Sequence, residues 1–341
     1  MEDTHFISAI DLKDAFWQIL LDPSSREKTA FTVANHGLYH FRCMPFGLVN
    51  SAARMSRLMD KVISRDLKKK CSTYLDDILV ISQTFQEHIQ TLEELALCLR
   101  KAGLTINIQK SKFCVKSVKY LGYVVGQGQL KKDPDKVSAV ENFPVLISVK
   151  AVRRFLGMVG WYSRFIENFS GCAAPISDVI KKHKKFNWTP EAQTAFENLK
   201  NALTSAPILW SPNYSLPFHI QCDASTVGIG SVIFQLDTNQ QERVVAYHSK
   251  KLNGAQKNYT ITELECLAVV ESIKKFRHFI EGTTFTVITD HWALKWLMSA
   301  KNLNGRLVRW ALSLQPYSFS IEHRRGSKNV VPDALSRAYY S

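Results

Sequence analysis

Two adjacent carboxylates stand in an otherwise apolar stretch of the sequence. Asp76 and Asp77 lie within residues 73–82, which read Thr-Tyr-Leu-Asp-Asp-Ile-Leu-Val-Ile-Ser. The β-branched residues predict a strand, or a hairpin with the acidic pair at its bend. Buried neighbouring carboxylates repel each other and lose hydration, so they require a cation. Hard oxygen ligands suit Mg²⁺, although an isolated pair of this kind is equally compatible with a surface turn.

A third aspartate extends this acidic pair to a candidate metal centre. Residues 6–11 are predicted to form a strand that ends in Asp11. Two acidic sites associated with strands can meet in space and hold two metal ions roughly 3.5–4 Å apart, as polymerases do for in-line phosphoryl transfer. The first strand and the acidic hairpin are therefore expected to lie side by side.

A second set of carboxylates occurs near the other end of the chain. The predicted strands 218–223 and 285–290 end in Asp223 and Asp290, and Asp333 begins a predicted short helix. Asp223 falls on the opposite face from the apolar residues of its strand, because side chains alternate along a strand. These positions allow the three carboxylates to converge over one face of a sheet.

Glu265 needs separate treatment, because Thr262-x-x-Glu265 has the form of a helix capping box. Thr260-x-x-Glu263 is a second box, however, and it accounts for the helix start without Glu265. Glu265 also lies on the apolar stripe of the predicted helix. A carboxylate on a buried stripe is unfavourable unless a cation meets it. We therefore assign Glu265 to a functional site rather than to the cap. The stripe continues through Ala268, Val269, Ser272, Ile273 and Phe276.

Periodicity and capping signals predict the remaining elements. The composition changes near Gly126, and a helical pattern runs over 133–204, with Asp133-Pro134 and Thr189-Pro190 as helix starts. We expect further helices at 12–19, 51–67, 86–102, 261–280, 292–298, 303–314 and from Pro332, and further strands at 29–33, 38–43, 118–124, 227–235, 243–250 and 317–323.

The bulk composition indicates a globular protein with a polyanionic partner. Of the 341 residues, 45% are hydrophobic, which argues against disorder, and the formal net charge of +14 favours nucleic acid as the partner. Seven scattered cysteines without a CxxC pair indicate reduced thiols in an intracellular setting. The acidic residues Glu2 and Asp3 argue against a signal peptide, and no apolar run is long enough to cross a bilayer.

The acidic hairpin belongs to an ordered series of motifs. Residues 8–124 resemble the palm of the reverse transcriptases of gypsy-type LTR retrotransposons (Metaviridae), and they are also similar to the gammaretroviral palm. The matching motifs are Asp-Leu-Lys-Asp-Ala-Phe (11–16), Met-Pro-Phe-Gly-Leu-Val-Asn-Ser (44–51), Tyr-Leu-Asp-Asp (74–77), residues 107–113, and Tyr-Leu-Gly-Tyr (120–123).

This resemblance implies that Asp11, Asp76 and Asp77 are the catalytic and metal-binding carboxylates of an RNA-directed DNA polymerase. It also implies that Leu121 and Gly122 belong to a primer grip. The family carries a fingers region before its first palm motif, whereas here that motif begins near Met1. Polymerase activity is therefore expected only if the fingers are supplied from elsewhere.

Four further residues receive roles in nucleotide binding from the resemblance. It implies that Phe16 excludes a 2′-hydroxyl and so selects deoxynucleotides, and that Phe46 and Asn50 border the nucleotide pocket. Lys110 would assist the departing pyrophosphate. From the residues alone, the two phenylalanines fit core packing and Lys110 fits a solvated surface position.

The second set of carboxylates matches the enzyme that follows the polymerase in the same elements. Residues 218–338 resemble its ribonuclease H domain. The matching motifs are Cys-Asp-Ala-Ser (222–225), Thr-Glu-Leu-Glu-Cys-Leu-Ala-Val (262–269), Thr-Asp-His (289–291) and Asn-Val-Val-Pro-Asp-Ala-Leu-Ser-Arg (329–337). Between the two regions, the helical segment 133–204 resembles the thumb. There, Trp161, Tyr162 and Arg164 are candidates either for template–primer contacts or for core packing.

The ribonuclease H resemblance implies four catalytic metal ligands, Asp223, Glu265, Asp290 and Asp333. Four carboxylates suit the chemistry, because two Mg²⁺ ions must flank one scissile phosphate. His323 is either a histidine for product release, as in retroviral enzymes, or a surface histidine beside Arg324.

Together the motifs predict an α+β polymerase palm with a helical thumb, followed by an α/β ribonuclease H-like domain with a mixed five-stranded sheet and flanking helices. The expected boundaries are 1–128 for the palm, 129–212 for the thumb and linker, and 213–341 for ribonuclease H.

The family resemblance also implies cofactors, partners and a location. It implies two Mg²⁺ or Mn²⁺ ions per active site. The implied partners are an RNA template, a DNA primer, an RNA–DNA hybrid and dNTPs, with no membrane. The assembly is either a homodimer or part of a larger Pol polyprotein, and the location is cytoplasmic, in a virus-like particle, or nuclear.

Two alternatives to an active two-enzyme segment remain open at this point. One is a ribonuclease H whose truncated palm is inactive and serves only as a clamp. The other is a domesticated scaffold that binds nucleic acid without turnover. Hybrid binding should weaken steeply with salt in every case, because phosphate contacts release counterions.

Overall fold

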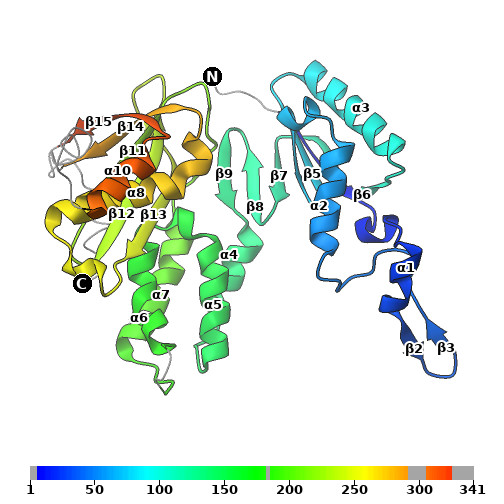
Figure 1. The fold of residues 1–341 in the computed structure, drawn as a ribbon, viewed down its shortest axis with the longest axis horizontal. Coiled ribbons are helices and arrows are strands. Elements are labelled where there is room, and N and C mark those ends of the chain that lie inside the picture. Colours follow the sequence, from blue (N-terminus) through cyan, green and yellow to red (C-terminus); the bar gives the residue numbers. More distant parts are fainter. Residues whose placement is uncertain (1–5, 182–184, 291–304, 325–341) are drawn as a thin grey trace. The chain divides into compact units, whose positions relative to one another are not determined.

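The computed structural model describes residues 6–181, 185–290 and 305–324 (Figure 1). The chain forms two compact units, residues 1–128 and 129–341, and each is described by itself. The division into three domains stays a prediction. Asp333 and the helices expected at 292–298 and from Pro332 lie outside the described residues.

The first unit is built on an antiparallel sheet with the strand order β4-β5-β1-β6. Strand β1 (Phe6–Leu12) pairs with β5 (Asp77–Ser82) on one side and with β6 (Ile106–Val115) on the other, and β4 (Cys71–Tyr74) pairs with the far side of β5. The acidic segment is therefore the hairpin between β4 and β5. Strand β6 was not predicted, because its mixed polar sequence shows no regular alternation.

Two helices pack against this sheet. Helices α2 (Ser51–Val62) and α3 (Phe85–Lys101) contribute to one apolar cluster with the central strands. The predicted stop signal of α3 is confirmed, because Gly103 adopts a left-handed conformation with φ = 70° just after the helix. The cluster includes Ile10, Leu12, Met55, Met59, Ile78, Val80, Leu95 and Leu99.

Several predictions in this unit were wrong in extent, among them the strands expected at 29–33 and 38–43, which cover only residues 31–33 and 37–39. The helix expected at 12–19 is only a 3₁₀ turn at Ala15–Gln18, which follows a left-handed Asp14. The helix expected at 51–67 ends at Val62. The strand expected at 118–124 is a hairpin of β7 (Ser117–Tyr120) and β8 (Tyr123–Gly126). The remaining elements are α1 (Pro23–Arg26), β2 (Phe31–Val33), β3 (Gly37–Tyr39) and the 3₁₀ turns Glu27–Thr29 and Leu67–Lys69.

The second unit begins with the predicted helical region. Its helices are α4 (Pro134–Glu141), α5 (Val149–Trp161), α6 (Phe169–Val179) and α7 (Pro190–Ser205), and the short strands β9 (Gln129–Lys132) and β10 (Leu209–Trp210) pair beside them. The predicted caps are confirmed. The side chains of Asp133 and Thr189 accept hydrogen bonds from the first turns of α4 and α7, and each is followed by proline. Tyr162 is buried, whereas Trp161 is exposed.

A mixed five-stranded sheet forms the rest of the second unit, as predicted. Its order is β13-β12-β11-β14-β15, with β14 parallel to both of its neighbours and the other pairs antiparallel. The strands are β11 (Phe218–Ala224), β12 (Gly228–Leu236), β13 (Glu242–Lys251), β14 (Thr284–Thr289) and β15 (Ser318–His323), with a 3₁₀ turn at Gln256–Asn258.

Helix α8 (Ile261–Ile280) packs against β11, β12 and β14, and α10 (Gly305–Leu314) packs against α8. The helical region joins the sheet through β13. At this strand the Ser170 backbone N–H donates to Ser249 Oγ at 2.8 Å, and beside it the Arg164 guanidinium lies 5.7 Å from the ring centroid of Phe279 in α8. Arg164 is therefore engaged within this unit. Within the described residues, no helix combines the length and apolar character needed to span a membrane.

Candidate active sites

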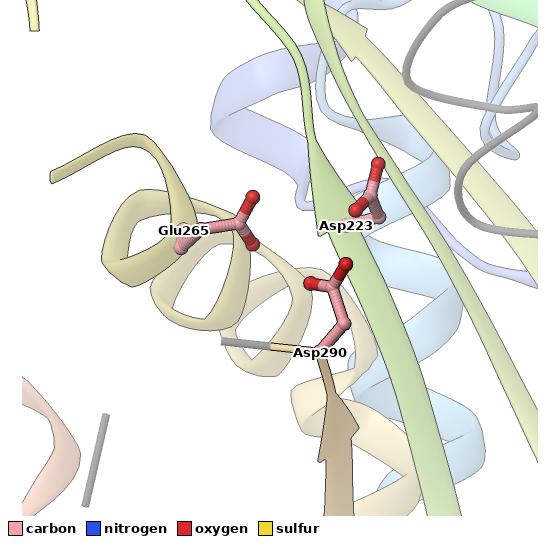
Figure 2. A group of neighbouring side chains, drawn as sticks. All are labelled: Asp223, Glu265 and Asp290. Atoms are coloured by element: carbon pink, nitrogen blue, oxygen red, sulfur yellow. The ribbon is translucent and has the colours of Figure 1, made fainter. Parts of the chain in front are cut away.

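The sheet of the second unit brings Asp223 and Asp290 together. Asp223 is the penultimate residue of β11, a strand with neighbours on both sides, and it is only 3% exposed. Asp290 directly follows β14, which runs parallel to β11. Because parallel neighbours end at the same edge of a sheet, the two carboxylates leave the sheet at adjacent points (Figure 2).

Helix α8 supplies Glu265 to the same point. The capping box of this helix consists of Thr260 and Glu263, as predicted, so Glu265 does not serve as the cap. The predicted stripe is buried along its whole length, and Glu265 itself is 5% exposed. Figure 2 shows its carboxylate directed toward Asp223 and Asp290.

The three side chains form a set of metal-ligand type. One carboxylate oxygen from each of Asp223, Glu265 and Asp290 lies within 4.8 Å of the other two. A search of the described residues for three or more potential metal ligands within this distance of one another finds this group. Three hard oxygen donors, two of them on buried residues, suit a divalent cation such as Mg²⁺ or Mn²⁺, which would offset their mutual repulsion.

The negative charges of this cluster affect the pKa of the neighbouring thiol of Cys222. Burial raises the pKa of Cys222 well above its ordinary value, and the charges of Glu265, Asp223 and Asp290 raise it further. Cys222 is therefore a protonated core residue rather than a thiolate ligand. The fourth predicted carboxylate, Asp333, lies outside the described residues.

His323 lies beside Asp290 at the end of β15. Its Nε2–H donates to the Asp290 backbone carbonyl at 2.9 Å, and the next residue, Arg324, donates its backbone N–H to Thr289 O at 2.9 Å. These bonds fix the end of β14, from which Asp290 projects. A role for His323 in product release stays a prediction.

In the first unit, the strand register sets Asp11 beside the acidic hairpin. Asp11 of β1 stands directly opposite Asp77 of β5, and the Leu12 N–H donates to the Asp76 backbone carbonyl at 3.1 Å. Burial is the main cause that raises the pKa of Asp77, followed by the charges of Asp76 and Asp11. Burial likewise raises the pKa of Asp11, and Lys110 opposes that shift. The predicted placement of the first strand beside the acidic hairpin is confirmed, whereas the carboxylates of Asp11, Asp76 and Asp77 do not form a group within 4.8 Å of one another, and their role as metal ligands stays a prediction.

The turn that carries the acidic pair has an unusual backbone. Tyr74 pairs with Asp77, so Leu75 and Asp76 form a two-residue loop. Leu75 has φ = 56°, a left-handed value that is unfavourable for a branched side chain. A strained residue of this kind persists only where its surroundings hold it, and such residues cluster at functional sites.

Irregularities in β6 bring Lys110 toward Asp11. The pairing of β1 with β6 shifts between Ala9 and Asp11, because β6 carries extra residues there. Ser111 fills the gap: its Oγ accepts the Asp11 N–H at 3.1 Å and donates to Asn107 O at 2.6 Å. Sequence analysis missed Ser111, because no local signal distinguishes a serine within a bulge from one on a regular strand.

Of the residues predicted to border the nucleotide pocket, Phe16 and Phe46 lie in contact with each other. The rings of Phe16 and Phe46 are 5.6 Å apart, and Trp17 contacts Phe46 at 6.2 Å between ring centroids. Phe46 is 68% exposed, so it is not a core residue, whereas Phe16 packs partly against the core. Asn50 is exposed at the start of α2. Their roles toward a nucleotide stay predictions.

The predicted primer-grip residues form the turn of the β7–β8 hairpin. Tyr120 pairs with Tyr123, and the two residues between them have positive φ angles, 49° for Leu121 and 78° for Gly122. Positive φ at both central positions is the pattern of a type I′ hairpin turn. The prediction of a continuous strand through these residues was wrong, because leucine at the first central position of the turn is not a recognisable turn signal.

Comparison with known proteins identifies both regions. Residues 2–125 match the family described as reverse transcriptase (RNA-dependent DNA polymerase), and residues 213–317 match the RNase H-like domain found in reverse transcriptase. The chain is 36% identical over 344 residues to the retrovirus-related Pol polyprotein from transposon opus of Drosophila melanogaster. The match covers 97% of this chain and 34% of the relative.

The chain contains the reverse transcriptase and RNase H-like domains of transposon Pol polyproteins. It is 33% identical to the Pol polyprotein from transposon gypsy of the same organism, over 97% of this chain and 33% of the relative. The chain therefore spans about a third of the length of these curated relatives.

Solved structures confirm the fold of this Pol segment. The foamy viral protease–reverse transcriptase in complex with an RNA/DNA hybrid matches with a TM-score of 0.79 and 23% identity, over 93% of this chain and 44% of that one. A second structure of the foamy viral enzyme, with double-stranded DNA, matches with a TM-score of 0.81 and 22% identity, over 94% of this chain and 57% of that one.

Proposed function

We propose that this Pol segment binds an RNA–DNA hybrid and cleaves its RNA strand at the site formed by Asp223, Glu265 and Asp290. One observation carries the proposal: carboxylate oxygens from two strands and one helix lie within 4.8 Å of one another, and two of the three residues are buried. Buried acidic residues that converge without a cation would destabilise the fold, so their retention favours metal binding.

Asp223, Glu265 and Asp290 would hold the divalent ions, with Asp333 as the fourth ligand predicted from the sequence. When bound, the ions supply electrostatic stabilisation of the charge that develops at the scissile phosphate. The protein's part is to keep the three carboxylates in fixed positions. The strand pairing of β11 and β14 fixes two of them, and the His323 hydrogen bond to Asp290 O fixes the strand end.

The partner is proposed from charge and from the relatives. A formal net charge of +14 favours a polyanion, and the foamy viral enzyme was solved with an RNA/DNA hybrid. Binding to this chain should therefore weaken steeply as salt rises.

The test is cleavage of an RNA–DNA hybrid with labelled RNA, in the presence of Mg²⁺ and after its removal with EDTA. Asp290→Asn keeps the size of the side chain but removes its charge, and we expect a loss of at least about 10²-fold in cleavage rate. Asp237→Asn is a matched control, because Asp237 lies in the same unit and pairs with Arg243 away from the cluster. Equal rates for wild type and Asp290→Asn would refute the proposal.

A second activity, extension of a DNA primer on an RNA template, is supported by the register that sets Asp11 opposite Asp77. Asp11, Asp76 and Asp77 would hold the metal ions, and Lys110 would meet the triphosphate. The test is incorporation of dNTPs by the wild type and by Asp77→Asn. Incorporation that persists in Asp77→Asn would exclude this site as its source.

The setting of the segment is proposed from the family. We propose that it acts as part of a larger Pol polyprotein or as a homodimer, in a cytoplasmic virus-like particle or in the nucleus. Size-exclusion chromatography with light scattering would distinguish a monomer from a dimer.

A further inference from the structure

Glu263, two residues before the candidate ligand Glu265, makes contacts in two directions. Its Oε2 accepts the Thr260 backbone N–H at 3.0 Å and the Thr260 hydroxyl at 3.2 Å. Its Oε1 accepts a hydrogen bond from Arg306 Nη1 at 2.8 Å. The residue is 9% exposed, so this ion pair is largely shielded from solvent on the carboxylate side. One carboxylate therefore caps α8 and joins it to α10.

Arg306, the partner of Glu263, stacks on an aromatic ring. The Arg306 guanidinium lies 3.9 Å from the centroid of the Tyr259 ring, just before the start of α8, and Tyr259 also contacts Trp310 of α10 at 6.0 Å between centroids. A planar guanidinium can stack on a ring and pair with a carboxylate at the same time, which an ammonium group cannot reproduce. Helix α10 thus contacts both the residue before α8 and the first turn of α8.

The position of Glu265 makes this contact relevant to the site. Asp223 lies within a strand and Asp290 directly follows one, whereas Glu265 is the fifth residue of α8, close to its first turn. The ends of helices open more easily than strands paired on both sides. A ligand near a helix end therefore depends on whatever holds that end in place.

We propose that Arg306 is a positioning residue for the nuclease site, which holds the first turn of α8 through Glu263 and thereby fixes Glu265 for metal binding. This inference rests on the proposed metal-dependent nuclease function. Residues that orient a metal ligand without touching the metal commonly change metal affinity by about 10–100-fold. Arg306 acts through one more residue, so an effect at the lower end of that range is expected.

The test compares Arg306→Met, Arg306→Lys and Glu263→Gln with wild type in the full chain. Two quantities are measured: the Mg²⁺ concentration at half-maximal hybrid cleavage, and Mn²⁺ binding without nucleic acid by electron paramagnetic resonance. We expect Arg306→Met to raise the Mg²⁺ midpoint by about 10-fold and to weaken Mn²⁺ binding similarly, with little change in KM for the hybrid. Arg306→Lys keeps the charge but loses the planar guanidinium that stacks on Tyr259 while it pairs with Glu263. We therefore expect its metal affinity to lie between those of Arg306→Met and wild type.

The matched control is Arg277→Met, because Arg277 pairs with Glu281 at the other end of the same helix. Its Mg²⁺ midpoint should equal that of wild type. A lower folded fraction of Arg306→Met with unchanged Mg²⁺ and Mn²⁺ midpoints would mean a purely structural role and would overturn the inference. If Arg306→Met does not fold, Glu263→Gln and Arg306→Lys decide by the same criterion. Wild type without cleavage would instead count against the nuclease function itself.

Discussion

Asp77 shows how a side chain proposed to be catalytic can work against the stability of its own fold. Its carboxylate is partly buried and close to Asp76 and Asp11, and these surroundings raise its pKa. A carboxylate whose pKa is higher in the folded than in the unfolded state destabilises the fold at every pH at which it is ionised in both. A divalent ion that bound here would reverse this effect.

We therefore expect Asp77→Asn to increase the free energy of unfolding by about 1 kcal/mol at neutral pH without divalent metal, since it removes one buried charge. Mg²⁺ should stabilise the wild type more than the variant. Urea denaturation with and without Mg²⁺ measures both effects. Asp60→Asn is the control, because Asp60 forms an exposed pair with Lys68 and should change stability by less than about 0.5 kcal/mol. A destabilised Asp77→Asn protein would contradict the argument.

His248 on β13 should make the second unit sensitive to acid. Its pKa is lowered to about 4, mainly by burial, with the charges of Lys275 and Lys250 acting in the same direction and that of Glu271 in the opposite one. In the unfolded chain the pKa is about 6.5. Between these values the unfolded state binds the extra proton, so stability is complete above about pH 6.5 and is lost as the pH falls toward 4.

At pH 5 this loss amounts to roughly 2 kcal/mol relative to pH 7.5. We expect His248→Gln to lose correspondingly less stability than wild type over the same interval. Urea denaturation at the two pH values gives the difference directly, and the exposed His36→Gln serves as the control. If wild type and His248→Gln shifted equally, the buried neutral state of His248 would not be the cause.

Single residues differed in how well the sequence predicted them. Glu265 was predicted because two capping boxes competed and only one was needed, and because a carboxylate on a buried stripe has few explanations. Ser111 was not predicted, because its role depends on a bulge that brings it to the Asp11 N–H, 100 residues away in sequence. A contact of that kind is a property of the strand register and not of the local sequence.

At the scale of elements, one buried amide holds the segment that leads into β11. Gln235, at the end of β12, is 4% exposed. Its Oε1 accepts the Asn213 N–H at 2.8 Å, and its Nε2 donates to Asn213 O at 2.8 Å and to Leu216 O at 3.0 Å. The segment that enters β11 is thus held by three hydrogen bonds from one side chain.

Gln235→Leu keeps the approximate volume but removes all three bonds, so two backbone carbonyls and one N–H lose their partner. The loss of a hydrogen bond by a fully buried group costs about 1–3 kcal/mol, and water can recover part of this cost here because Asn213 and Leu216 are exposed residues. We expect a total destabilisation of roughly 2–4 kcal/mol, measured by urea denaturation, together with faster amide exchange over residues 213–216. Gln241→Ala, at an exposed position, should have no comparable effect. A Gln235→Leu protein as stable as wild type would show that the hydrogen bonds of Gln235 do not hold this segment.

Elements with strong local signals were predicted best. Helix α8 has the predicted bounds, 261–280, because a capping box and a long apolar stripe agree there. The β7–β8 hairpin was missed, since its turn places Leu121 in a left-handed conformation that tertiary contacts must impose. Strand β6 was missed for a similar reason, because its bulges interrupt the alternation by which strands are recognised.

At the scale of the whole molecule, the two candidate sites belong to separate compact units. The palm aspartates lie in residues 1–128 and the nuclease carboxylates in residues 129–341, and each unit has its own sheet and its own apolar cluster. Position in the sequence pattern singled out Asp11, Asp223 and Asp290 at strand ends and Glu265 on a buried helical stripe, whereas Asp333 lies outside the described residues. Their geometry required the sheet registers, which the sequence does not encode locally.

Because each site is built from residues of its own unit, we expect a substitution at one site to leave the activity of the other unchanged. On an RNA template with a recessed DNA primer, we expect Asp77→Asn to cleave the hybrid within about twofold of the wild-type rate, and Asp290→Asn to lose cleavage by at least about 10²-fold. Labelling the RNA and the primer separately resolves cleavage and extension in one reaction. Any extension by the wild type should survive in Asp290→Asn and disappear in Asp77→Asn. A tenfold loss of cleavage in Asp77→Asn would mean that the two units are coupled on the hybrid.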